Sequence, residues 1–331
     1  MGMETLAKQF DEALTLIGIG EKANRAQAAH EEVRQVLESS ETLRKWGVDT
    51  ILIGSYARQT AIYPGKDVDV FSKMTKLDTS MSPTTVFEAV RDTLVSHYGR
   101  RASPQRRSVK VAFGEDFAVD AVPAARSRAH WAVPNRNQAE WMQPASRWVE
   151  TDPERLWDLR TQRNKHPTVG GQGAYVPIVK LVRQIREHHL GEVKPGGLYL
   201  ELLTYHAFGE TMRGASFAEF LAITLRRITV LLGAAVQKPL IDPALGTSYA
   251  PAPDAGELQA AQVQFGKLAA EAERALGLER CPAAMVWREI LGKNDRGPCF
   301  PLPAGCDESG RVISAVTVNT RRGSDEARPF A

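Results

Sequence analysis

Two aspartates stand one residue apart in a stretch whose pattern predicts a strand. Residues 67–71 read DVDVF, so acidic and apolar side chains alternate with a period of two. On a strand, Asp67 and Asp69 point to the same face, about 7 Å apart, while the valines point towards the core. Two such carboxylates repel each other unless a cation lies between them. A divalent cation such as Mg²⁺ binds carboxylate oxygens and leaves room for substrate phosphates.

A second element precedes these acids. Residues 51–53 (ILI) predict a short buried strand, and Gly54 and Ser55 follow at the start of a segment long enough for one or two helical turns. Backbone N–H groups at the start of a helix bind phosphates, and a glycine there lets a ligand approach the backbone closely. The simpler interpretation, in which the two acids only form the wet face of an edge strand, leaves this element unexplained.

Gly54-Ser55 followed by Asp67-x-Asp69 resembles the signature of the DNA polymerase β-type nucleotidyltransferase superfamily. The resemblance implies transfer of a nucleotidyl group from an NTP to an acceptor hydroxyl. It also implies a third catalytic carboxylate on a strand beside the one that carries the first two.

A predicted hairpin supplies this third acid. Residues 108–113 (SVKVAF) and 116–122 (DFAVDAV) both alternate as strands around a turn. Asp120 lies inside the second strand and matches the superfamily position. Glu115 and Asp116 are the alternatives, but they fall at the turn.

Length, composition and net charge limit the classes of protein to which this chain can belong. The chain has 331 residues, enough for two packed domains, with 43% hydrophobic and 24% charged residues. A net charge of +3 suits anionic small molecules such as nucleotides and falls short of a DNA-coating protein. The N-terminus does not resemble a signal sequence, and no apolar run reaches the roughly 20 residues that span a bilayer. No P-loop motif occurs. These features predict a soluble, cytoplasmic protein.

Three cysteines occur, all late in the chain: Cys281, Cys299 and Cys306. An odd number without a C-x-x-C pair predicts no disulfide framework and a reducing compartment. Metal binding by the three is a weaker alternative.

Regular elements surround the motifs. Helical spacing predicts helices within 3–17, 22–46 and 82–99 before the hairpin. The arginine-rich segment 100–107 (RRASPQRR) predicts either a solvated loop or a loop that lies over bound phosphates or a nucleic-acid backbone. Pro123 is expected to end its strand, and residues 124–152 are expected to be irregular, with tryptophans covering a core edge. A capped helix follows from Pro153 to about residue 165. The rest is predicted to be helical, over 175–189, 196–209, 216–236, 256–277 and 282–291.

Four segments together resemble the cGAS/DncV-like nucleotidyltransferases of bacteria: GSYARQTAIYPGKDVDVF, FAVDAVPA, YVPIVKLVRQIR and GGLYLELLTYHAF. These enzymes are related to oligoadenylate synthase and produce the signal of anti-phage CBASS operons. The resemblance implies an α+β fold with a mixed sheet. It implies a catalytic lobe over residues 1–167, a helical lobe over 168–304, a flexible tail over 305–331, and the donor NTP in the cleft between the lobes.

The resemblance also implies the chemistry. Asp67, Asp69 and Asp120 would hold two Mg²⁺ ions, with Mn²⁺ as the alternative, and Gly54 and Ser55 would bind the donor phosphates. The substrates would be ATP, GTP or a pyrimidine NTP. The product would be a cyclic di- or trinucleotide, or an oligonucleotide, with release of pyrophosphate.

The chain departs from the family pattern at two places. Gln59 stands where the family often has glycine, and the helical-lobe motif, usually a lysine followed two residues later by tryptophan, reads Arg183 and Ile185. The cation is kept and the aromatic ring is not. Lys180 and Arg183, one helical turn apart, are therefore both candidates for the phosphate-binding residue, or else form a solvated helix face.

Other functions and partners stay open at this point. One alternative is a nucleotidyltransferase that modifies RNA or a protein partner, and another is a catalytically silent nucleotide-binding protein. A membrane partner is not expected, and nucleic acid is not required. The effector would respond to the product, and CBASS accessory proteins could conjugate the chain through Ala331. Base choice, linkage and ring size are not determined by the sequence.

Overall fold

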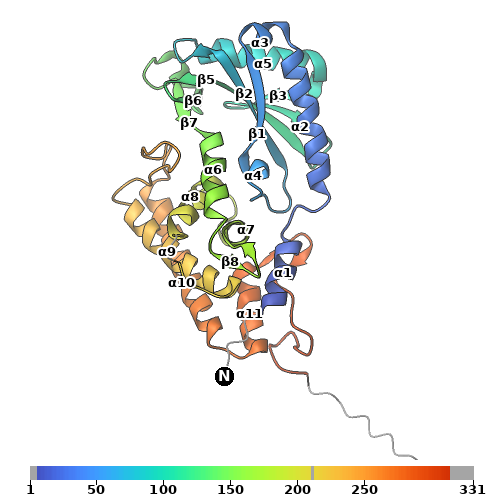
Figure 1. Ribbon diagram of the computed structural model, residues 1–331, viewed down its shortest axis with the longest axis vertical. Coiled ribbons are helices and arrows are strands. Elements are labelled where there is room, and N and C mark those ends of the chain that lie inside the picture. Colours follow the sequence, from blue (N-terminus) through green and yellow to red (C-terminus); the bar gives the residue numbers. More distant parts are fainter. Residues whose placement is uncertain (1–5, 210–211, 314–331) are drawn as a thin grey trace, which may run out of the picture.

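The computed structural model describes residues 6–209 and 212–313. Figure 1 shows an elongated molecule with the large sheet towards one end and helices α7–α11 towards the other. We call these the sheet half and the helical half. The bounds of the helical half are α7 Tyr175–Leu190, α8 Gly197–Ala207, α9 Phe217–Ala235, α10 Ala255–Leu276 and α11 Arg280–Leu291.

The sheet has seven strands in the order β1-β2-β5-β4-β3, with β6 paired to β5 and β7 paired to β6. In this sheet only the β2–β5 pairing is parallel, so the sheet is mixed, as the family resemblance implies. Its strands are β1 Val48–Ile53, β2 Asp67–Asp78, β3 Ala102–Pro104, β4 Val109–Ala112, β5 Ala118–Ser127, β6 His130–Pro134 and β7 Trp148–Thr151.

Two helices cover one face of this sheet. The valines of the DVDVF stretch, Val68 and Val70, are fully buried against α2 (Lys22–Ser39) and α5 (Pro83–Tyr98). The short helix α3 (Glu41–Lys45) joins α2 to β1. Because successive residues alternate across a strand, burying the valines leaves the two aspartates on the face that these helices do not cover.

The helical half has a hydrophobic cluster of its own, and the first helix belongs to it. Helix α1 (Ala7–Leu16) precedes the sheet in sequence, yet Phe10 packs edge-on against Trp287 and Phe300, each with ring centroids 5.1 Å away. Helix α6 (Pro153–Arg163) leads from β7 towards α7 (Figure 1). Asp152 caps α6 by accepting a hydrogen bond from the Arg155 N–H, as its sequence predicts.

The predicted irregular stretch contains strands instead. Strand β5 continues through Pro123 to Ser127, and β6 and β7 follow, so the predictions of a strand end at Pro123 and of irregular structure over 124–152 are wrong. Proline lacks an amide hydrogen, but Pro123 falls between Ala121, where pairing with β4 ends, and Ala125, where pairing with β6 begins. The remaining small elements are η1 Gly99–Arg101, η2 Gln138–Met142, β8 Thr168–Val169, β9 Gln172–Gly173, β10 Lys293–Asn294 and β11 Gly297–Pro298.

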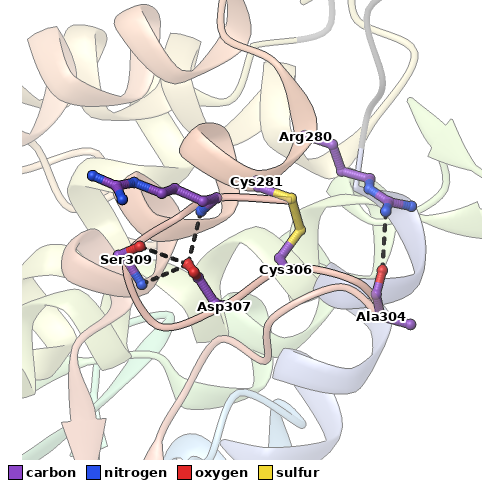
Figure 2. The surroundings of a disulfide bond; sticks show 7 residues. Arg280, Cys281, Ala304, Cys306, Asp307 and Ser309 are labelled. Carbon is purple, nitrogen blue, oxygen red and sulfur yellow. Dashed lines mark hydrogen bonds between the residues drawn. A yellow bond between two sulfur atoms is a disulfide. The ribbon is translucent and has the colours of Figure 1, made fainter. Parts of the chain in front are cut away.

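A disulfide joins Cys281 to Cys306, which the cysteine count did not predict. Figure 2 shows how the chain after α11 folds back and brings Cys306 beside the start of that helix, with Cα atoms 5.4 Å apart. Their separation of 25 residues gives no hint of this return. Asp307 fixes the turn that follows, accepting hydrogen bonds from the backbone and hydroxyl of Ser309 and from the N–H of Arg311.

The third cysteine and the chain end complete this region. Cys299 is buried and unpaired. Residues 305–313 of the predicted tail are placed by the contacts just described, whereas Ala331 lies outside the described residues. Over the described ranges, no helix is both long and apolar enough to cross a membrane.

Candidate active site

The sheet brings two of the three predicted catalytic acids side by side. In the parallel pairing of β2 with β5, Asp69 lies directly opposite Asp120. Asp67 precedes Asp69 by two residues on the same face of β2 and opens the strand. The alternation that buries the valines therefore places all three carboxylates on the same face, near the first residues of β2 and β5.

Burial and mutual repulsion disturb these acids. Burial raises the pKa of Asp69, and the Arg58 guanidinium opposes that rise. Burial also raises the pKa of Asp120 to about 6, against the lowering effect of Lys110 and with a further contribution from Asp69. The Asp120 Oδ1 atom is buried with no hydrogen-bond partner among the described residues. Burial, more than any neighbouring charge, therefore keeps the pKa of both carboxyls above the ordinary value.

Lys110 is a member of the site that our sequence reasoning missed. It lies opposite Asp120 on β4, and its Nζ donates a 3.0 Å hydrogen bond to Asp67 Oδ1. Burial lowers the pKa of Lys110, but the hydrogen bond to Asp67 and the charge of Asp120 outweigh it, so the pKa is raised. The sequence held a signal, because Lys110 is the polar position of the alternating SVKVAF strand and pairs in a hairpin with the strand of Asp120.

The predicted phosphate-binding turn lies directly against the acids. Strand β1 ends at Ile53, and the single-turn helix α4 (Gly54–Ala57) begins at once. Gly54 has a φ of 73°, and a Cβ atom there would overlap the Asp69 carboxylate, so only glycine fits. The Ser55 carbonyl accepts hydrogen bonds of 2.8 and 3.1 Å from the Thr60 and Ala61 N–H groups, which closes the turn.

A buried carboxylate of the helical half holds the residue that follows this turn. Glu201 of α8 is 4% exposed and Arg58 is 7% exposed, and they share hydrogen bonds of 2.6 and 3.3 Å. The Thr60 hydroxyl donates to the same carboxylate at 3.2 Å, and Arg183 of α7 lies 3.5 Å from it. We call Arg58, Thr60, Arg183 and Glu201 the inter-half charge cluster. Of these four residues, the sequence analysis identified only Arg183 as a candidate site residue.

One cavity of about 870 Å³ lies against the turn and two of the acids, whereas Asp120, Lys110 and Glu201 are not among the residues that line it. Gly54, Ser55, Asp67, Asp69 and Arg183 line it, together with side chains of β6, β7 and the 242–250 loop of the helical half. Apolar groups that suit a nucleobase face the same space: Phe71, Val122, Val133, Trp148, Leu198 and Tyr249.

Lys180, the other phosphate candidate, lies elsewhere. It lines a separate cavity of about 530 Å³ with His30, Tyr56 and Gln59. Burial, followed by the charge of Arg160, lowers its pKa. Of the two candidates from α7, the structure brings Arg183 to the large cavity and leaves Lys180 in the smaller one.

The carboxylate oxygens of the three aspartates are the kind of ligand that a divalent cation binds. The described residues contain no group of three or more His, Cys, Asp or Glu side chains close enough together to form a complete metal cage. Mg²⁺, however, is commonly held by one or two carboxylates together with substrate phosphates and water. The unpartnered Asp120 Oδ1 and the exposed Asp67 supply oxygens of the required kind.

Comparison with known proteins identifies a family domain in the first half of the chain. Residues 3–164 match the model of the Second Messenger Oligonucleotide or Dinucleotide Synthetase domain. A cyclic AMP-AMP-AMP synthase from an Acinetobacter species is 26% identical over 311 residues, which are 88% of this chain and 87% of that protein. Residues 3–164 therefore carry a domain of this kind, and the predicted resemblance to the cGAS/DncV-like nucleotidyltransferases is confirmed.

Solved structures agree in fold. Escherichia coli CdnC with ATP has a TM-score of 0.68 at 16% identity, covering 89% of this chain and 98% of that one. Bradyrhizobium diazoefficiens CdnG with GTP has a TM-score of 0.65 at 14% identity, covering 82% and 91%. These findings confirm the predicted family, the α+β fold and the nucleotidyltransferase class, and with the domain match they confirm the synthesis of a nucleotide second messenger.

Proposed function

We propose that this enzyme joins NTPs, ATP among them, into a cyclic di- or trinucleotide and releases pyrophosphate, in anti-phage signalling. The observation that carries the proposal is the placement of three carboxylates near the first residues of β2 and β5, beside the Gly54–Ser55 turn, which opens on a cavity large enough for nucleotides. ATP is included because the Acinetobacter relative is a cyclic AMP-AMP-AMP synthase.

Each group has a role in this proposal. The backbone of the α4 turn and Arg183 bind the donor triphosphate, and the apolar cavity wall receives its base. Asp120 would hold the cation beside the acceptor hydroxyl, and a cation there would lower the pKa of that hydroxyl and help it lose its proton. Asp67, Asp69 and Asp120 would hold Mg²⁺ or Mn²⁺, which when bound supplies the positive charge that the triphosphate and the acids require.

The test is incubation of the pure protein with labelled NTPs and Mg²⁺, followed by chromatography and mass spectrometry. Small phosphatase-resistant products support the proposal, and labelled RNA or protein would support the macromolecule-modifying alternative. Asp69→Asn should abolish product. Asp116→Asn is the matched control, because Asp116 is an exposed acid at the β4–β5 turn paired with Lys22 at 2.9 Å. Full activity in Asp69→Asn would refute the assignment.

The proposal extends to an accessory protein. E. coli CdnC, which shares the fold, has been solved in complex with a HORMA protein. We propose that a partner of this kind acts on the present enzyme, and co-purification from cells that express the neighbouring genes would test it. Conjugation at Ala331 stays a prediction from the sequence.

A further inference from the structure

Two arginines line the large cavity without belonging to the inter-half charge cluster. Arg107 ends the arginine-rich segment and Arg136 follows β6, and both line the cavity that Asp67 and Asp69 also line. Among the described residues, neither guanidinium has a hydrogen-bond or ion-pair partner. Arg58 and Arg183, by contrast, are both tied to Glu201.

The backbone around both arginines is fixed rather than loose. The Gln138 amide donates to the carbonyl oxygens of Arg106 and Gln105 at 3.1 and 3.4 Å, which fastens one loop to η2. The Trp141 indole N–H donates to the Asn135 carbonyl at 2.7 Å, which fastens the other loop to the same element. Holding both loops on one short helix presents the two cations together.

Their neighbourhood favours an anion. Burial and then the charge of Arg136 lower the pKa of Arg107, while Tyr249 and Asp69 raise it. Two like charges at one wall repel each other until a negative group lies between them. Phosphate groups meet this need best, because guanidinium binds two phosphate oxygens at once.

The proposed reaction requires two phosphate-bearing nucleotides in one cleft. The acceptor oxygen bonds to the donor α-phosphorus, the bond from that phosphorus to the β-phosphate oxygen breaks, and its electron pair leaves with pyrophosphate while the hydroxyl proton is lost. The acceptor keeps its own 5′-triphosphate throughout this step. A donor held at the α4 turn and Arg183 leaves the second triphosphate without a binding group.

We propose that Arg107 and Arg136 form a second phosphate subsite, which holds the 5′-triphosphate of the acceptor nucleotide and of a linear intermediate while it accepts a further nucleotide. At ring closure the triphosphate of the intermediate moves to the donor site, where its α-phosphorus is attacked and its pyrophosphate leaves. This inference rests on the proposed function and adds the group that the acceptor must carry. It also gives the segment 100–107 a role through one residue, Arg107, whereas its neighbour Arg106 is exposed and does not line the cavity.

The experiment compares two acceptors that differ only in their phosphates. With labelled ATP as donor, the Michaelis constant is measured for pppApA and for ApA, each as the 2′–5′ and the 3′–5′ isomer. The wild-type enzyme should favour pppApA by roughly tenfold or more, the ratio expected from hydrogen bonds to charged groups. Arg107→Met and Arg136→Met should each bring the ratio of the two constants towards one. Arg106→Met is the matched control and should keep the wild-type ratio.

The outcomes separate this inference from the proposed function. If Arg107→Met keeps the wild-type preference for pppApA, or weakens both acceptors by the same factor, the phosphate subsite is refuted while cyclic-nucleotide synthesis stands. If the wild-type enzyme forms no nucleotide product at all, the proposed function itself fails. Loss of the preference in both methionine variants, with donor-analogue binding kept within twofold, supports the subsite.

Discussion

Glu201→Gln removes the negative charge from the inter-half charge cluster while keeping the side chain's shape. Glu201 is almost fully buried and contacts Arg58, Thr60 and Arg183. Removing one partner of a buried ion pair typically costs about 3–5 kcal/mol, because the remaining charge is left buried without compensation. Glutamine still accepts one hydrogen bond, so we expect a loss near the lower end, about 3 kcal/mol in the free energy of unfolding.

The assay is urea denaturation followed by circular dichroism, with Glu41→Gln as the control. Glu41 pairs with Lys45 at 2.8 Å on the exposed surface of α3. Such a pair contributes under about 0.5 kcal/mol, so this control should unfold like the wild type. If Glu201→Gln lost no more stability than Glu41→Gln, the reasoning from burial would be wrong.

The pH dependence of the free energy of unfolding gives an independent check on the role of Glu201. Burial raises the pKa of Glu201, but Arg58 and the other cluster members outweigh burial, and the net pKa lies below the ordinary value of 4.5. A carboxyl with a lowered pKa in the folded state stabilises the protein fully above that ordinary value, and this contribution is lost as the pH falls below it. Glu201→Gln should therefore show a smaller loss of stability between about pH 5 and pH 3 than the wild type. An equal loss in both proteins would contradict the assigned ionisation.

Three further predictions address other parts of the molecule. Gly54→Ala should reduce product formation by roughly a hundredfold, because its Cβ displaces the Asp69 carboxylate; Gly20→Ala, also at positive φ but with open space around it, should keep its activity. Cys281→Ala should cost about 3 kcal/mol in urea unfolding, from the loss of a link across 25 residues, and reductant should destabilise the wild type but not the variant. Burial, and then Arg34, lower the pKa of His30 below 6.5, so stability should fall as the pH drops below that value; His30→Gln should flatten this dependence, and an unchanged slope would refute it.

The sequence predicted the elements that carry local patterns. Alternation located β2 and placed Asp67 and Asp69 on one face, and the helical spacings located the helices of the helical half within a few residues. Both signals are local. In a strand the buried face consists of every second residue, and in a helix it consists of residues three and four positions apart, so neighbouring residues alone reveal it.

The groups that the sequence missed depend on distant partners. Arg58 and Glu201 are separated by 143 residues, and nothing near Glu201 distinguishes it from any other acid on a helix. The disulfide was missed for the same reason, because only the return of the chain past α11 brings Cys306 to Cys281. Strands β6 and β7 were missed because prolines and turns suggested irregular structure, while pairing across the sheet edge decided otherwise.

Gln59 shows how a departure from a family pattern can be compensated. Its φ of 58° lies in the left-handed region, where glycine, which the resemblance implies is often present at this position, fits without strain. Holding glutamine there costs on the order of 1–2 kcal/mol. The Gln59 Oε1 atom, however, accepts a 2.6 Å hydrogen bond from the Arg160 guanidinium of α6, and a bond to a charged donor contributes about 1.5–3 kcal/mol.

The two magnitudes are similar, so the bond offsets the strain and adds a second tie to the segment that follows the phosphate-binding turn. Glu201 of α8 holds Arg58, and Arg160 of α6 holds the next residue. Two helices outside the sheet thus fix the end of the α4 turn. We infer that the orientation of this turn depends on how the two halves pack, and that a change in their packing would reach the donor site through Arg58 and Gln59 before it reached the acids of β2.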